Sequence, residues 1–136
     1  MAVKIFLTLM LLIAAPLTGL AHHSTAMFNM ENPITLTGVV KSFVWKNPHV
    51  FLYFDVNGPD GKAEEWLIEM HSTAIMLRRG YTNETFKPGD NITVIGGGMK
   101  DGSKMMRLLR GSFQDGKKFY GDDFSPGTAG TENSGK

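Results

Sequence analysis

Apolar residues occupy every second position through much of the chain, which is the period of a strand with one buried face. Residues 49–57 show this most clearly, because Val50, Leu52, Phe54 and Val56 share one face. Similar runs, rich in β-branched and aromatic residues, predict five strands in total. The predicted strands cover residues 34–45, 49–57, 63–71, 91–95 and 105–113.

Between the third and fourth predicted strands the pattern becomes helical. Ser72 is a favourable N-cap, residues 73–79 can form two helical turns, and Gly80 follows at a typical helix end. Three strands, a short helix and two strands is the order of the OB-fold, a Greek-key barrel. Gly38 and the glycines at 96–98 fit this fold, because strands bend where a barrel closes. We therefore expect an all-β, five-stranded OB-like barrel, with an open sandwich as the alternative.

The turn between the second and third predicted strands sets their pairing. If Asp60 lies at its centre, Phe51 stands opposite Glu69, and His49 stands opposite His71. These residues belong to the outward set of each strand, which in OB-folds is the usual ligand-binding face. Two imidazoles opposite each other are close enough to share a metal ion. The alternative is that His49 packs at a strand start and His71 has no role.

Aromatic residues on the same outward face indicate a second kind of site. Phe51 and Tyr53 are two residues apart on the second predicted strand, beside Glu69 of the third. Together they can form a surface for a peptide or an aromatic ligand. We therefore expect Phe51, Tyr53 and Glu69 to be ligand-binding residues if this face is used.

The first 21 residues have the pattern of a secretory signal peptide. Lys4 gives a positive start, an apolar run covers residues 5–15, and Ala21 is a small residue suited to cleavage. The apolar run is shorter than the ~20 residues of a spanning helix, and no later run is longer. We expect cleavage after Ala21 and export to a bacterial periplasm, with no membrane span in the mature chain. An uncleaved anchor is the alternative.

After the signal peptide at 1–21, we expect an N-terminal arm, one barrel domain and a disordered tail. The tail lacks apolar periodicity. The expected bounds are 22–33 for the arm, 34–120 for the barrel and 121–136 for the tail.

Composition excludes several classes of protein. The chain of 136 residues has no Cys, which excludes disulfide scaffolds, Cys-ligated metal centres and Cys nucleophiles. It carries 14 Lys and Arg against 13 Asp and Glu, so the basic excess of a nucleic-acid-binding protein is absent. Nucleotide-binding, serine-hydrolase and zinc-protease motifs are also absent. The sequence therefore predicts a non-enzymatic protein and indicates no particular oligomeric state.

Other charged residues give no clear site. The adjacent pairs Glu64/Glu65 and Asp122/Asp123 are not placed for acid–base catalysis, since their side chains diverge on a strand or lie in the expected tail. Arg107 is one of several scattered basic residues that we expect on a solvated face.

The expected N-terminus of the mature chain is a candidate copper site. His22 would carry a free α-amine and an imidazole, a chelating pair suited to copper. His23 adds a second imidazole, and Met27 and Met30 add thioethers, which favour the cuprous ion. The alternative is a solvated N-terminus without bound metal.

Several motifs occur in an order that resembles a family of small exported bacterial proteins of unknown function. They are His-His-Ser at 22–24, Asn-Pro-His at 47–49, Lys-Pro-Gly-Asp at 87–90 and Lys-Asp-Gly-Ser at 100–103. The resemblance implies a periplasmic location without an established activity. In that family the position of His71 is often a small residue, which favours the other three histidines as ligands. A looser, fold-level similarity is to periplasmic copper chaperones of the OB type.

These observations favour a periplasmic protein that binds or carries copper through His22, His23 and His49. The alternative is a metal-free accessory domain that docks a periplasmic protein or small ligand through Phe51 and Tyr53. A third hypothesis is a copper oxidase that uses the N-terminal histidine.

Overall fold

The computed structural model describes residues 25–125, which form seven regular elements. The helix α2 (Thr73–Arg78) has six residues, and no helix within residues 25–125 is long and apolar enough to cross a membrane. The strands are β1 (Ile34–Val44), β2 (Phe51–Asn57), β3 (Ala63–Glu69), β4 (Asn91–Gly98), β5 (Met105–Phe113) and β6 (Lys118–Tyr120).

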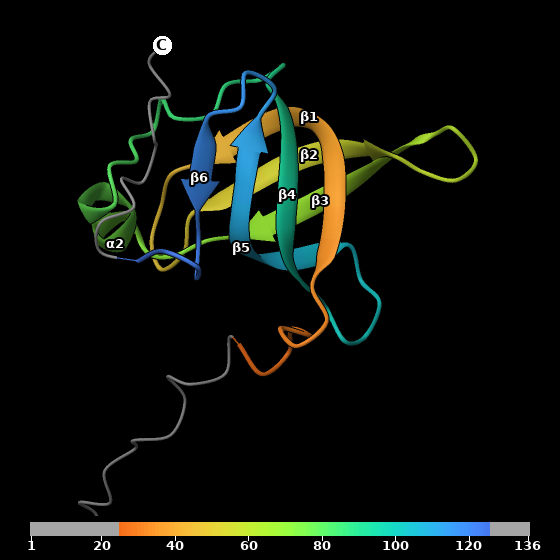
Figure 1. Cartoon of the computed structure of the whole chain (residues 1–136), viewed down its shortest axis with the longest axis horizontal. Coiled ribbons are helices and arrows are strands. Elements are labelled where there is room, and N and C mark those ends of the chain that lie inside the picture. The colour runs from red at the N-terminus through yellow and green to blue at the C-terminus, as the bar shows by residue number, and fades with distance from the viewer. Residues whose placement is uncertain (1–24, 126–136) are drawn as a thin grey trace, which may run out of the picture.

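The strands form one sheet that closes on itself (Figure 1). Their order is β3-β2-β1-β4-β5-β6, and a parallel pairing of β3 with β5 joins the two sides. This pairing makes a closed five-stranded barrel and excludes the open sandwich, so the predicted fold class is confirmed. The strand β6 adds to β5 outside the barrel and was not predicted, because three residues are too few for a periodic signal. Its Phe119 is nevertheless fully buried.

The predicted register between β2 and β3 is correct. Phe51 lies opposite Glu69 and Tyr53 lies opposite Leu67. Just before β2 and after β3 the pairing shifts by one residue, because Met70 donates its N–H to the carbonyl of Val50 while Val50 donates its own to the carbonyl of His71, both at 2.9 Å. Within β2 and β3, the side chains that share a face of the hairpin are therefore those that the alternation predicts.

Two glycines allow strands to approach closely where the barrel bends. A Cβ at Gly38 would lie 2.2 Å from the carbonyl oxygen of Asp55, and one at Gly96 would lie 2.2 Å from that of Arg107. The pairing of β1 with β2 shifts between residues 40 and 42, and that of β4 with β5 shifts at Gly96. The expected bend of β4 at its glycines is confirmed, whereas in β1 the bulge follows Gly38 instead of coinciding with it.

The helix covers one end of the barrel and ends at a glycine, as predicted. Gly80 has φ +85°, and Tyr81 donates its backbone N–H to the carbonyl of Met76 at 3.1 Å. This is the hydrogen-bond pattern of a Schellman motif, and both Met76 and Tyr81 are buried. The Tyr81 hydroxyl donates to the carbonyl of Tyr120 and accepts its N–H, so it ties the helix end to β6. Burial raises the pKa of Tyr81, which keeps this donor protonated.

Residues 121–124 fold back along β5 instead of leaving the barrel. Gly121 and Asp122 donate backbone N–H groups to Leu109 and Leu108 at 2.7 and 2.9 Å, and Arg79 donates to the Gly121 carbonyl at 2.5 Å. This segment lies within the tail expected from Gly121, so the packed structure extends further than the sequence predicted. Residues 126–136 lie outside the described part of the chain.

A candidate polar site at the barrel seam

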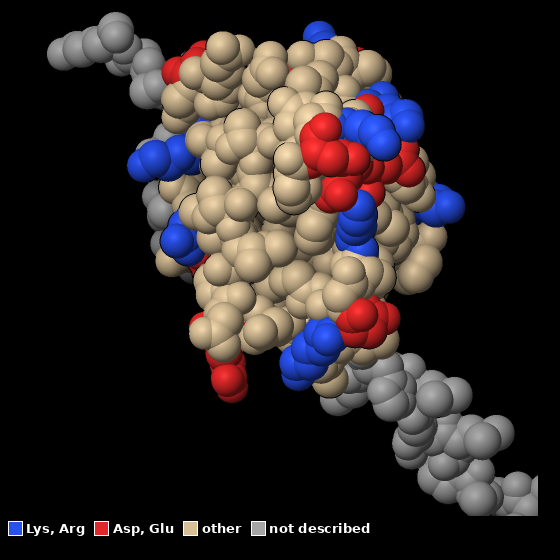
Figure 2. All heavy atoms as spheres, turned by 90° about the vertical axis from the view of Figure 1, so that its right-hand side faces the viewer, with Lys and Arg blue, Asp and Glu red and all other residues tan. Residues whose placement is uncertain are grey.

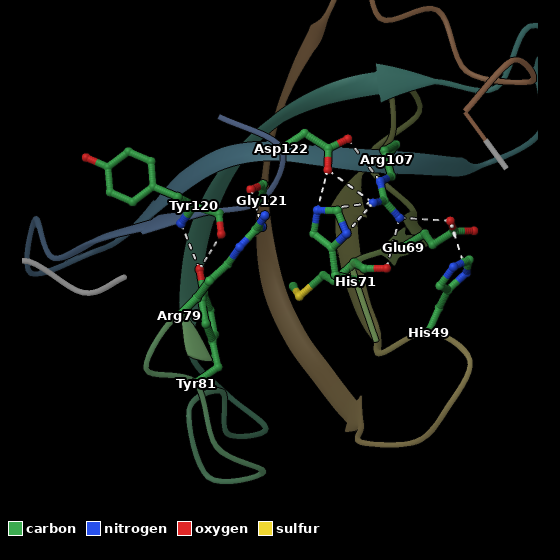
Figure 3. A network of polar contacts seen from close by, with 10 residues as sticks. His49, Glu69, His71, Arg79, Tyr81, Arg107, Tyr120, Gly121 and Asp122 are labelled. Carbon is green, nitrogen blue, oxygen red and sulfur yellow. Dashed lines mark hydrogen bonds and ion pairs between the residues drawn. The ribbon is translucent and has the colours of Figure 1, made fainter. Parts of the chain in front are cut away.

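Glu69 on β3 and Arg107 on β5 lie side by side where these strands close the barrel. Both side chains point away from the interior, since the neighbouring Ile68 is in the core. Glu69 and Arg107 are nevertheless only 5% and 4% exposed. His71 and Asp122 lie over them (Figure 3). A charged pair is therefore enclosed on the outer side of the seam.

Arg107 uses all five of its N–H donors. Nη1 donates to Oε1 of Glu69 at 3.0 Å and to the carbonyl of Met70 at 2.9 Å. Nε and Nη2 each donate to one oxygen of Asp122 at 3.1 Å, and Nη2 also donates to Nδ1 of His71 at 2.9 Å. A guanidinium has five N–H groups and no acceptor, so nothing remains for a ligand. Arg107 fixes its neighbours, and its expected place on a solvated face is wrong.

Both ring nitrogens of His71 have protein partners. Nη2 of Arg107 lies 2.9 Å from Nδ1 and 3.3 Å from Nε2, and Nε2 also contacts Oδ1 of Asp122 at 2.6 Å. Burial alone raises the pKa of Asp122, but hydrogen bonds from His71 and Arg107 and their charges outweigh it and bring the pKa to about 2.

His49 lies at the open edge of this network, as Figure 3 shows. Its Nδ1 is 3.2 Å from Oε1 of Glu69, and its side chain is 29% exposed. Its Nε2 forms no hydrogen bond or ion pair with a protein group within residues 25–125. The loop before His49 is held by Asn47, whose Oδ1 accepts hydrogen bonds from the N–H and hydroxyl of Thr73 at 3.2 and 2.9 Å. One end of the imidazole is thus fixed and the other is free.

The structure places the predicted metal ligands differently from the expected shared site. His49 and His71 occupy the same end of the β2–β3 hairpin, but one contacts Glu69 and the other Arg107 and Asp122. Each imidazole therefore has its own polar partners in the structure. Within residues 25–125, no three or more His, Asp or Glu side chains are grouped to hold a metal ion.

The other predicted donors lie at or beyond the start of the described structure. His22 and His23 lie outside the described residues. Met27 is 47% exposed, whereas Met30 packs its sulfur against Gly97, where a Cβ would be 2.5 Å from it. Met30 is therefore engaged in packing, and Met27 remains accessible.

The predicted ligand surface on the outer face is only partly available. Glu69 is buried and holds Arg107, so it is not free for a ligand. Tyr53, Leu67 and Met105 instead follow one another across β2, β3 and β5 and are partly exposed. With Phe51 beside them, they form an apolar row on the outer face of the sheet.

Two glutamates at the turn end of β3, here called the hairpin tip, form exposed or half-exposed ion pairs with lysines outside the hairpin. Lys41 contacts Glu65 at 2.5 Å, and Lys104 contacts Glu64 at 2.7 Å. On this side of the molecule the basic and acidic residues lie together, and large areas between them carry no charge (Figure 2). This face therefore has no extended patch of one sign.

Sequence reasoning missed Arg107 and Asp122 as partners of the two histidines. The predicted strand pairing offered one signal. It places Glu69 on the outward face of β3, and a carboxylate there needs a hydrogen-bond partner wherever other residues cover the strand. The return of residues 121–124 over β5 had no such signal, because the stretch lacks periodicity.

A family model described as a family of unknown function (DUF6152) matches residues 10–107. The chain belongs to this family. The matched part of the DUF6152 protein includes His49, Glu69, His71 and Arg107, whereas Asp122 lies beyond it. The resemblance seen in the sequence is confirmed at this level. No match was found to a curated protein or to a solved structure.

Proposed function

We propose that this DUF6152 protein is an exported, non-enzymatic protein that binds copper through imidazole nitrogens, with His49 as the ligand from the barrel. The observation that carries the proposal is the chain of contacts from Arg107 through Glu69 to His49. Metal-binding histidines usually present one nitrogen to the metal and the other to a carboxylate, which fixes the ring. His49 has this arrangement, with Nε2 as the free nitrogen.

One imidazole does not make a metal site, so further donors are required. We infer that they come from His22 and His23, with Met27 as an accessible thioether. Cleavage after Ala21 would give His22 a free α-amine in addition to its imidazole. A periplasmic location is part of this proposal, because it rests on the predicted signal peptide.

Isothermal titration of the processed protein with Cu²⁺, and with Cu⁺ under reducing conditions, tests the proposal. We expect one high-affinity site, and about tenfold weaker binding when His49→Asn removes one nitrogen ligand. A form extended by one Met before His22 should bind much more weakly, because its α-amine has moved away from the histidine.

His71→Asn is the matched control, since both nitrogens of His71 are already engaged. It should retain the affinity of the wild type, provided that circular dichroism shows an unchanged fold. If His49→Asn binds as tightly as the wild type, the barrel does not contribute a ligand. If the Met-extended form also binds equally well, the copper proposal fails entirely.

A second candidate function is docking of a partner without metal. It is favoured by the apolar row of Tyr53, Leu67 and Met105, in which the Tyr53 hydroxyl has no hydrogen-bond partner within residues 25–125. Aromatic residues of this kind are common in protein interfaces. The double variant Phe51→Ala/Tyr53→Ala should then abolish capture of a periplasmic partner without changing copper affinity.

A further inference from the structure

Phe113 lies at the end of the barrel opposite Arg107, since it is the last residue of β5 and Arg107 is near the first. Three adjoining hollows meet at its side chain, at the end where β4 begins and the β5–β6 turn returns (Figure 1). The largest has a volume of ≈ 440 Å³, within the range of small-molecule sites. It is lined by Gly89, Asp90, Asn91, Phe113, Gln114 and Asp115.

The Phe113 ring is held rigidly. Phe86 stacks on it at a centroid distance of 5.2 Å and an angle of 27°, and Phe119 meets it at 5.2 Å and 66°. Both of these residues belong to the buried core. A fixed aromatic surface loses little conformational entropy when an apolar face of a ligand packs against it.

The polar side chains around Phe113 are available for hydrogen bonds. The side-chain amides of Asn91 and Gln114 are exposed and have no partner within residues 25–125. Each amide offers two N–H donors and one oxygen acceptor. Asp90 and Asp115 each use one carboxylate oxygen to accept a backbone N–H within its own turn, which leaves the other oxygen free.

The charges around the hollows are balanced. Lys87 and Lys117 line the third hollow together with Asp90 and Asp115, so two positive and two negative groups meet there. A strongly charged ligand therefore gains little from this site. A neutral ligand with many hydroxyl groups fits it better, because hydroxyls can both donate to the carboxylates and accept from the amides.

From this combination we propose that the depression around Phe113 binds a neutral sugar, either free or as a unit of a glycan. The apolar C–H face of a pyranose packs on the Phe113 ring, and its hydroxyl groups bond to Asn91, Gln114 and Asp115. The site is independent of the copper proposal, since it shares no residue with the seam. Its exposed position and few contacts imply millimolar affinity.

Titrations of ¹⁵N-labelled protein, followed by amide chemical shifts, test this proposal. The probes are glucose, maltose and the disaccharide of N-acetylglucosamine, with glycerol as a non-sugar polyol. We expect saturable shifts at residues 87–92 and 112–117. Tighter binding of either disaccharide than of glucose would identify a glycan as the ligand, and equal binding would identify a free sugar.

Substitutions at exposed positions separate binding from folding. Asn91→Ala/Gln114→Ala removes two amides without touching the core and should weaken binding about fivefold. Phe113→Leu keeps an apolar side chain but loses the ring, and should weaken it further. Asn32→Ala, at an exposed position near the opposite end of β4, is the matched control and should bind like the wild type. The proposal is overturned if no probe gives saturable shifts, if glycerol gives the same shifts, or if the double variant binds unchanged.

Discussion

Two glutamates on the same face of β3 differ greatly in environment. Glu65 is exposed and contacts Lys41, whose side chain is 55% exposed. Glu69, four residues later, is buried and contacts Arg107, whose side chain is 5% exposed. The two glutamates share one strand and one face, but only the second pair lies beneath other parts of the chain.

The difference shows that burial beneath other residues, and not pairing alone, determines how much an ion pair contributes to the free energy of unfolding. Exposed pairs contribute little, because water and salt screen the charges. An enclosed pair must be fully hydrogen-bonded, since an unpaired buried charge is very costly. At the seam, residues 121–124 and His71 provide the cover, and Arg107 satisfies every N–H it carries.

The largest expected effect is therefore on Arg107. Arg107→Met retains much of the volume but leaves Glu69 and Asp122 without their cation, and should lower the free energy of unfolding by ~3–5 kcal/mol. Urea denaturation measures this loss. Arg107→Lys, which keeps the charge but not the planar fork, should lose less. A loss below about 1 kcal/mol for Arg107→Met would show that the seam is as solvated as the hairpin tip.

Asp122→Asn should have a smaller effect, because the side-chain shape and one acceptor remain. We expect a loss of ~1–3 kcal/mol at neutral pH. The pKa of Asp122 is lowered from 3.8 to about 2 in the folded protein, so its ionised form stabilises the fold above pH 3.8. This stabilisation disappears as the pH falls through about 2.

Thermal denaturation between neutral pH and pH 2 measures this dependence. The wild type should lose stability in acid more steeply than Asp122→Asn, and the two curves should converge near the pH at which Asp122 protonates. Parallel curves over the whole range would contradict a depressed pKa and would place Asp122 in solvent, like Glu65.

The local pattern of apolar, polar and glycine positions was sufficient to predict most of the fold. Alternation, the glycine positions and the turn at Asp60 predicted the barrel, the helix and the register of Phe51 with Glu69. Each of these signals depends on neighbouring residues or on one hairpin, and such information is present in a single segment.

The seam could not be predicted in the same way. Arg107 and Glu69 are 38 residues apart, and Asp122 follows in a segment without periodicity. Only the closed barrel, and the chain returning over β5, determine that a basic residue on an outward position becomes buried. The sequence placed His49 opposite His71, but the pairing shifts by one residue at Val50, and the separate partners of the two histidines depend on this long-range cover.

The two histidines offer an internal test of the same contrast. His71→Asn should lower stability by ~1–2 kcal/mol through lost hydrogen bonds at the covered side, while copper affinity stays unchanged. His49→Asn, at the open side, should change stability by less than ~0.5 kcal/mol and weaken copper binding. Paired urea and copper titrations on both variants measure this separation. If both variants change both properties equally, the network acts as one unit and has no open side.

The smallest effect is expected at the exposed pair. Lys41→Met removes the contact with Glu65, but both side chains remain in water, so the released carboxylate is solvated again at little cost. The urea midpoint should match that of the wild type at low and at high salt. The proximity of Glu65 raises the pKa of Lys41 through a hydrogen bond and charge attraction, yet this group stays protonated at neutral pH with or without its partner. A loss like that of Asp122→Asn would mean that the hairpin tip is covered by something as effective as residues 121–124.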